Sequence, residues 1–172
     1  MPQNFLLLIL LLTSTFALSQ KQEPRLVLPI GHTETVNSAV FSPDGKLALT
    51  ASGDNTARIF EVATGKELQA LSGYTREVRS AVFSTDGKLA LTASWDKTAR
   101  IFEVATGKAL QVLSGHTSWV KSAVFSPDGK LALTASWDKT ARIFEVATGK
   151  ALQVLSGHTD WVRSAVFSPD GK

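Results

Sequence analysis

Histidine, hydroxyl and aspartate side chains recur together in this 172-residue chain, and such a trio is able to hydrolyse esters or amides. His116 is preceded by Thr92, Ser94 and Asp96, which are the candidates for one such set. Catalysis would also need an exposed nucleophile, an oriented base and an oxyanion hole. The chain has no Gly-x-Ser-x-Gly elbow, and the same residue types return at fixed spacing along it. We therefore predict a structural trio and no catalytic residue.

Other chemistries lack their residues or their spacing. There is no cysteine for a thiolate site, and the three histidines lie far apart without paired ligand spacing. The Asp-containing turns lack the series of ligands found in a calcium loop. Each glycine is placed to serve a turn, so no phosphate-binding loop is expected. We predict no metal and no cofactor.

These residues are carried by an internal repeat of 42 residues that opens at Gly31, Gly73, Gly115 and Gly157. The predicted organisation is repeat 1 at 31–72, repeat 2 at 73–114, repeat 3 at 115–156 and a partial repeat 4 at 157–172.

Each unit divides into four short runs rich in β-branched and aromatic residues. In the first unit the predicted strands are Val36–Ser42, Leu47–Ser52, Ala57–Val62 and Glu67–Leu71. The turns between them read PDGK, GDNT and ATGK, in which proline and glycine set the backbone. Short strands between such turns indicate antiparallel hairpins and an all-β chain.

The period, the turn spacing and the opening Gly31-His32 pair resemble the WD-repeat family of β-propellers, from Leu26 to Lys172. The VFSPDGK run, Asp54 and the Ile59-Phe60-Glu61 stretch also carry the resemblance. It implies that one repeat makes one four-stranded blade, with the blades circling a channel. Three units and a part cannot close a ring, so the expected fold is an incomplete β-propeller of four-stranded antiparallel blades, an open arc.

The Trp-Asp pair that gives the family its name is replaced by Phe-Glu, as in Phe60-Glu61. In the family the Trp donates to a Ser or Thr that is linked through His to the turn Asp. Phenylalanine cannot donate, so each blade is expected to lose a hydrogen bond worth about 1 kcal/mol. In the second unit Tyr74 also replaces the His. The resemblance implies structural roles for His32, His116, His158, Asp54, Asp96, Asp138, Phe60, Phe102 and Phe144.

Differences between the copies cluster in two places, the segment after Gly-His-Thr and the turn before the third strand. In a propeller these two loops emerge on one face, which in the family is the usual protein-binding surface. Trp and Arg are enriched at interface hot spots. The predicted binding residues are Trp95, Trp119, Trp137, Trp161, Arg79, Lys121 and Arg163. The alternative is that the Trp residues are half-buried packing between blades.

The charge argues against nucleic acid as a partner. The net charge is only +3, and most basic residues recur at fixed unit positions, as Lys46, Lys88 and Lys130 do. A nucleic-acid site would need a dense basic stripe.

The N-terminus predicts a signal peptide at residues 1–19. An apolar stretch, Phe5–Leu12, is followed by small residues, and cleavage is expected after Ser19. The stretch is too short to span a bilayer, so we expect a secreted or periplasmic protein without stable membrane insertion. Because no Lys or Arg precedes the stretch, an uncleaved anchor or a buried apolar helix stays open. In segment 20–30, Arg25–Ile30 aligns with the fourth strand of a unit and would be an orphan outer strand.

The sequence thus favours a non-catalytic, exported scaffold that binds a protein or peptide. Two alternatives remain, a sensor or docking portion of a larger enzyme and a self-assembling repeat array. An incomplete ring implies either a fragment of a longer product or, if the chain is complete, self-association.

Overall fold

A computed structural model describes residues 31–171. The predicted signal peptide and the orphan strand at Arg25–Ile30 lie outside the described residues. Within them the chain is all β, as predicted, and contains no helix that could cross a membrane.

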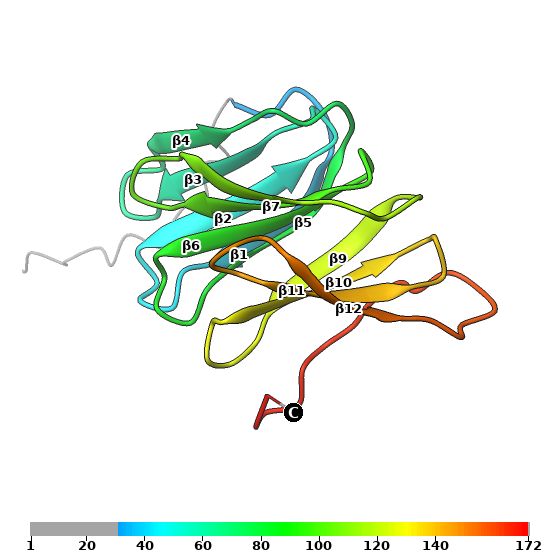
Figure 1. The fold of residues 1–172 in the computed structure, drawn as a ribbon. Coiled ribbons are helices and arrows are strands. Elements are labelled where there is room, and N and C mark those ends of the chain that lie inside the picture. Colours follow the sequence, from blue (N-terminus) through cyan, green and yellow to red (C-terminus); the bar gives the residue numbers. More distant parts are fainter. Residues whose placement is uncertain (1–30, 172) are drawn as a thin grey trace, which may run out of the picture.

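The strands form three separate four-stranded sheets, which we call blades 1 to 3 (Figure 1). Blade 1 contains β1 (Val36–Phe41), β2 (Leu47–Ser52), β3 (Ala57–Glu61) and β4 (Glu67–Leu71). Blade 2 contains β5 (Val78–Phe83), β6 (Leu89–Ser94), β7 (Ala99–Glu103) and β8 (Ala109–Leu113). Blade 3 contains β9 (Val120–Phe125), β10 (Leu131–Ser136), β11 (Ala141–Glu145) and β12 (Ala151–Leu155). The predicted strands of the first unit are confirmed, with β1 and β3 each ending one residue earlier.

Local hydrogen bonds explain why the turns fall where they do. In the first hairpin the Ser42 hydroxyl donates to Asp44 at 2.7 Å and accepts from the Leu47 N–H at 2.9 Å. Gly45 has a φ of 71°, a conformation that glycine adopts without a Cβ clash. The same turn recurs in the second and third units, so the antiparallel pairing of the first two strands is fixed locally.

One irregularity recurs in the innermost strands β1, β5 and β9. Val36 pairs with Ser52, but the next pair is Ser38 with Ala51, so Asn37 is an extra residue. Arg79 in β5 and Lys121 in β9 are extra in the same way. Such a β-bulge bends the strand and re-aims the side chain of the extra residue.

The core lies between blades. Buried side chains from one face of blade 1, including Leu49, Ile59 and Leu71, pack against Val78 and Phe102 of blade 2. Blade 2 packs against blade 3 through the equivalent residues. Val162 and Phe167 of the partial repeat cover the far side of blade 3, although residues 157–171 contain no strand. The three sheets remain separate, consistent with the expected incomplete propeller.

Candidate protein-binding face

Two loops of each blade are joined at one end of the molecule, as the sequence predicted. The backbone N–H of Gly53, in the turn between β2 and β3, donates to the Thr35 carbonyl at 2.8 Å. Trp95 donates in the same way to Glu77, and Trp137 to Trp119, each at 3.0 Å. We call this end of the molecule the loop face.

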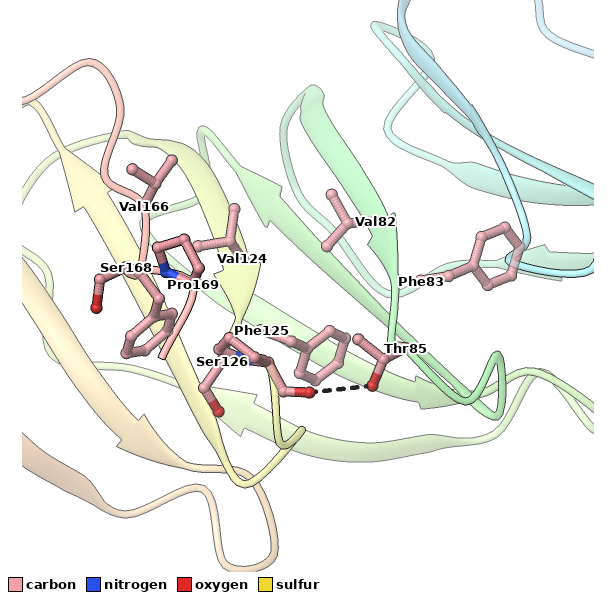
Figure 2. A pocket seen from close by; sticks show the side chains of 11 residues that line it. Val82, Phe83, Thr85, Val124, Phe125, Ser126, Val166, Ser168 and Pro169 are labelled. Atoms are coloured by element: carbon pink, nitrogen blue, oxygen red, sulfur yellow. Dashed lines mark hydrogen bonds between the residues drawn. The ribbon is translucent and has the colours of Figure 1, made fainter. Parts of the chain in front are cut away.

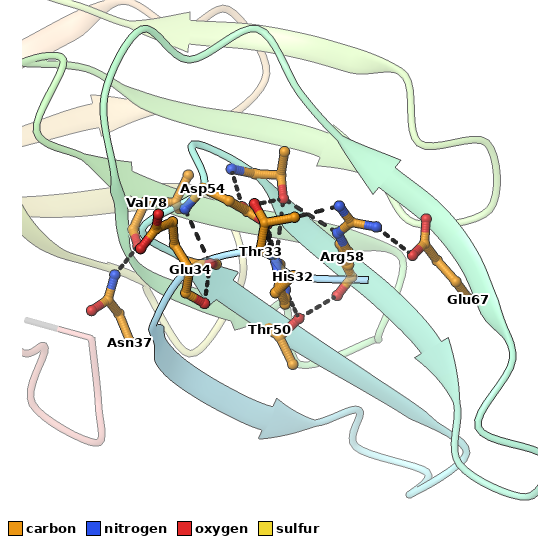
Figure 3. Close-up of polar contacts among 11 residues, drawn as sticks. His32, Thr33, Glu34, Asn37, Thr50, Asp54, Arg58, Glu67 and Val78 are labelled. Atoms are coloured by element: carbon orange, nitrogen blue, oxygen red, sulfur yellow. Dashed lines mark hydrogen bonds and ion pairs between the residues drawn. The ribbon is translucent and has the colours of Figure 1, made fainter. Parts of the chain in front are cut away.

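A buried histidine side chain supports the loop face in blades 1 and 3, and Figure 3 shows the network of blade 1. His32 lies between the Thr50 hydroxyl, 2.7 Å from its Nε2, and the Asp54 carboxylate, 2.8 Å from its Nδ1. His116 makes the same contacts to Thr134 and Asp138, each at 2.7 Å. The sequence grouped His116 with Asp96 and with Thr92 or Ser94 of the preceding unit, and that grouping is wrong, because His116 bonds to residues of the unit that it opens. The hydroxyl in the network is a Thr of the second strand and not a Ser.

The protonation states in this network follow from its surroundings. Burial raises the pKa of Asp138, but hydrogen bonds from Thr140, His116 and the Thr117 N–H outweigh it and lower the pKa to about 2. Burial lowers the pKa of His116, against the opposing effect of Asp138. A neutral His116 then donates from Nδ1 to the carboxylate and accepts the Thr134 hydroxyl at Nε2. Both ring nitrogens of His116 are thus hydrogen-bonded, although no indole N–H takes part.

Phenylalanine fills the place of the family's tryptophan by packing alone. Phe102 and Phe144 are fully buried, and Phe60 lies edge-on to the His32 ring with the centroids 6.5 Å apart. Phe102 lies beside Tyr74, with the centroids 6.1 Å apart.

Blade 2 builds the network differently. The Tyr74 hydroxyl bonds directly to the Thr92 hydroxyl, and burial raises the pKa of this phenol. The Arg100 guanidinium lies over the Tyr74 ring, 4.8 Å from its centroid, and reaches Asp96 at 3.5 Å. The Tyr hydroxyl thus replaces the His–Thr bond, and Arg100 takes the place of the His–Asp bond.

His158 lies apart from these networks. Its side chain is exposed. Its structural role stays a prediction from the resemblance.

The trio has no access to a substrate. The side chain of His116 has no exposed surface, that of Asp138 is 4% exposed, and Thr134 is buried. Residues 31–171 also contain no group of three His, Cys, Asp or Glu residues able to hold a metal ion. What these side chains do is position the two loops.

The four tryptophans form one continuous stack on the loop face, which we call the Trp ladder. Trp95 stacks on Trp119 with the centroids 4.1 Å apart, and Trp137 stacks on Trp161 at 4.0 Å. Trp119 and Trp137 join the two pairs at 4.8 Å. Trp95, Trp119 and Trp137 are half-buried in this way, whereas Trp161 is 46% exposed. The stack links blade to blade, which is the packing that the sequence offered as an alternative.

The three predicted cations, Arg79, Lys121 and Arg163, are close enough for the charges of the two arginines to act on Lys121, and we call them the cation row. The Arg79 guanidinium lies over the Trp95 ring, 4.6 Å from its centroid. Arg79 also pairs with Glu77 at 3.1 Å. Arg79 and Lys121 project from β-bulges, and the strands predicted from the sequence did not include these bulges. The bulge is seen in the burial of both Val78 and Ala81, which lie three residues apart and so break strict alternation, and this burial is known only from the structure.

An apolar groove of about 430 Å³ lies at the opposite end of the innermost strands (Figure 2). Its walls include Val82, Val124 and Val166, one from each of three successive units. The groove contains no charged side chain and lies away from the Trp ladder and the cation row.

Comparison with known proteins agrees with this architecture. The family model described as WD domain, G-beta repeat matches residues 22–61, 65–103, 107–145 and 149–172, which is most of the chain. A WD repeat-containing protein of Synechocystis, itself uncharacterized, is 46% identical over 44 residues, which are 25% of this chain and 13% of that protein. The guanine nucleotide-binding protein subunit beta of Oryza sativa subsp. indica is 48% identical over 42 residues, which are 24% of this chain and 11% of that subunit. The subunit beta of Zea mays matches to the same extent. The matches to these relatives thus span about one repeat and a small part of their length.

Proposed function

The chain belongs to the WD40 repeat family, and we propose that it is a non-catalytic, exported scaffold that binds a protein or peptide through its loop face. WD40 repeats are typical of protein-interaction scaffolds. Fold alone does not give function, so the proposal rests on the loop face itself.

The observation that carries the proposal is the meeting of the Trp ladder with the cation row. Copies that are otherwise nearly identical differ here, and aromatic and arginine side chains are the types that dominate interfaces. Because three of the four indoles are half-buried against each other, the Trp ladder offers a partner a preformed surface. Trp161 and Arg163 are the exposed members that a partner would meet first.

A peptide selection tests the proposal. Random dodecapeptides displayed on phage are selected on the immobilised full chain, and the enriched peptides are then measured on variants. The double variant Trp161→Ala/Arg163→Ala removes two exposed loop-face side chains and is expected to weaken binding by about tenfold or more, as for interface hot spots. The matched control, Lys88→Ala/Lys130→Ala, alters exposed lysines in turns at the opposite end and should bind like the unaltered chain.

Melting curves separate binding from packing. Trp119→Ala should lower the melting temperature, since its ring stacks on both neighbours. Peptides that bind the loop-face double variant as tightly as the unaltered chain would contradict a binding role for this face.

Export is supported by the apolar stretch Phe5–Leu12 and the small residues that follow it. Expression of the full chain in a bacterial host and mass measurement of the product test it. A product that begins at Gln20 is expected, and an intact N-terminus on a soluble product would contradict export.

A further inference from the structure

The cation row is built on a repeated distortion of the backbone. Asn37, Arg79 and Lys121 are the extra residues of equivalent bulges in β1, β5 and β9, and Arg163 occupies the same position in the fourth unit. Bulges re-aim side chains and are common beside functional sites. The bulge therefore presents one side chain per unit at the loop-face end of the innermost strands.

Side chains at this position in neighbouring blades are close enough to touch. Asn37 accepts a hydrogen bond from Arg79 Nη1 at 2.8 Å and donates to the Val78 carbonyl at 3.0 Å (Figure 3 shows the second bond). At this junction an amide oxygen thus faces a guanidinium. In the next two units the same position holds Lys121 and Arg163, and the charges of Arg79 and Arg163 both act on Lys121.

The charges of the row are only partly balanced. Burial lowers the pKa of Lys121, and the positive charges of Arg79 and Arg163 lower it further, while Glu77 opposes them. Glu77, the carboxylate that opposes them, already pairs with Arg79. The positive charges of the row are therefore only partly offset at Lys121.

Hydrogen-bond donors without acceptors lie in the same region. Within residues 31–171, Arg79 Nε and the indole N–H groups of Trp95 and Trp137 are buried and have no hydrogen-bond partner. A buried donor left unpaired is costly, so the region is short of acceptors. Because these donors are buried, a ligand at the surface would meet the cations and the exposed Trp161.

We propose that the cation row binds an acidic peptide segment, whose carboxylates lie between Arg79, Lys121 and Arg163 and accept hydrogen bonds from their charged ends. The proposal deepens the proposed function and rests on it. Charge complementarity selects an anionic partner, and carboxylates accept from both guanidinium and ammonium groups. A single-stranded nucleic acid is disfavoured because its bases need free aromatic faces on which to stack.

Titration with hexaglutamate tests the proposal, with tryptophan fluorescence of the full chain as the signal, since Arg79 lies against Trp95 and the four indoles stack on one another. Binding is expected to weaken about tenfold as salt rises from roughly 50 to 300 mM, because the attraction is between charges. Hexaglutamine of the same length should not bind. Saturable binding of hexaglutamate with no response to hexaglutamine is the expected result.

Lys121→Met is the decisive variant, because methionine keeps the length of the half-buried side chain and removes its charge. It should raise the dissociation constant for hexaglutamate by about fivefold or more, as for a charge at a contact. Lys88→Met, which alters an exposed lysine at the opposite end, is the matched control and should leave the constant unchanged. Equal effects of the two variants would overturn the proposal.

Two further outcomes also overturn it. A hexathymidylate that binds as tightly as hexaglutamate would show attraction to any polyanion, and inorganic phosphate that saturates the site alone would show a small-anion site. If neutral phage peptides still bind the loop face while hexaglutamate does not, the acidic ligand is wrong but the scaffold function stands.

Discussion

The two complete junctions, blade 1 against blade 2 and blade 2 against blade 3, share a core and differ at their rims. Leu71 at the first and Leu113 at the second are fully buried in equivalent clusters. At the loop face, however, Gly53 lies beside Glu77 in the first junction, whereas Trp95 stacks on Trp119 in the second. The core fixes how blades pack, and the rim is free to change because its residues add contacts at the edge only.

The two junctions also differ in the ring that bonds to the buried threonine of the second strand. Tyr74 reaches Thr92 at the first junction, and His116 reaches Thr134 at the second. Both arrangements give the buried threonine hydroxyl a hydrogen-bond partner. The partner matters more than the kind of ring that provides it, because a buried hydroxyl without a partner is costly.

The largest expected effect tests whether the two cores are equal. Leu71→Ala and Leu113→Ala each remove a fully buried side chain and should each lower the free energy of unfolding by about 2–5 kcal/mol. Leu155→Ala is the matched control, because Leu155 holds the same unit position but is 40% exposed, and it should cost less than about 1 kcal/mol. Urea denaturation followed by circular dichroism measures all three.

A large gap between Leu71→Ala and Leu113→Ala would show that the rims, and not the shared core, set the strength of a junction. Three equal values would show that the outer strand contributes little beyond its own blade.

The second prediction concerns the histidine network, which only one of the two junctions has. Asp138→Asn replaces a carboxylate that accepts from His116, the Thr117 N–H and Thr140. Its pKa of about 2 lies below the ordinary 3.8, so its contribution is present above about pH 4 and is lost as the pH falls towards 2. The variant should lower the free energy of unfolding by roughly 2 kcal/mol at pH 7, and the difference from the unaltered chain should shrink near pH 2.

Asp96→Asn is the matched comparison in blade 2, where Arg100 at 3.5 Å takes the place of the histidine. It should cost less at pH 7, because the carboxylate has no histidine partner. Denaturation curves at several values of pH measure both variants, and a pH-independent difference for Asp138→Asn would contradict the assignment.

Strands and turns were predictable from the sequence because local chemistry decides them, as the Ser42–Asp44 turn illustrates. The proximity of the segment after Gly-His-Thr to the turn before the third strand was also predictable, because the order of the hairpins places both at the same end of a blade. The Trp ladder was harder, since stacking of Trp95 on Trp119 depends on how neighbouring blades are placed. The bulges at Arg79 and Lys121 were missed because alternation was read within single strands, and the break shows only when burial is known.

The smallest expected effect lies in the turn before the third strand, where the units again differ. Asn55 in the first unit and Lys97 in the second both have left-handed backbones, with φ of 66° and 74°. Asparagine adopts this region more readily than lysine, because the left-handed conformation costs ordinary residues about 1–2 kcal/mol. Lys97→Asn should therefore raise the free energy of unfolding by about 0.5–1 kcal/mol. Urea denaturation measures the gain, and Lys88→Asn, at an exposed lysine outside this region, should leave stability unchanged. An equal gain in both variants would mean that the loss of a positive charge, and not relief of backbone strain at residue 97, raises the free energy of unfolding.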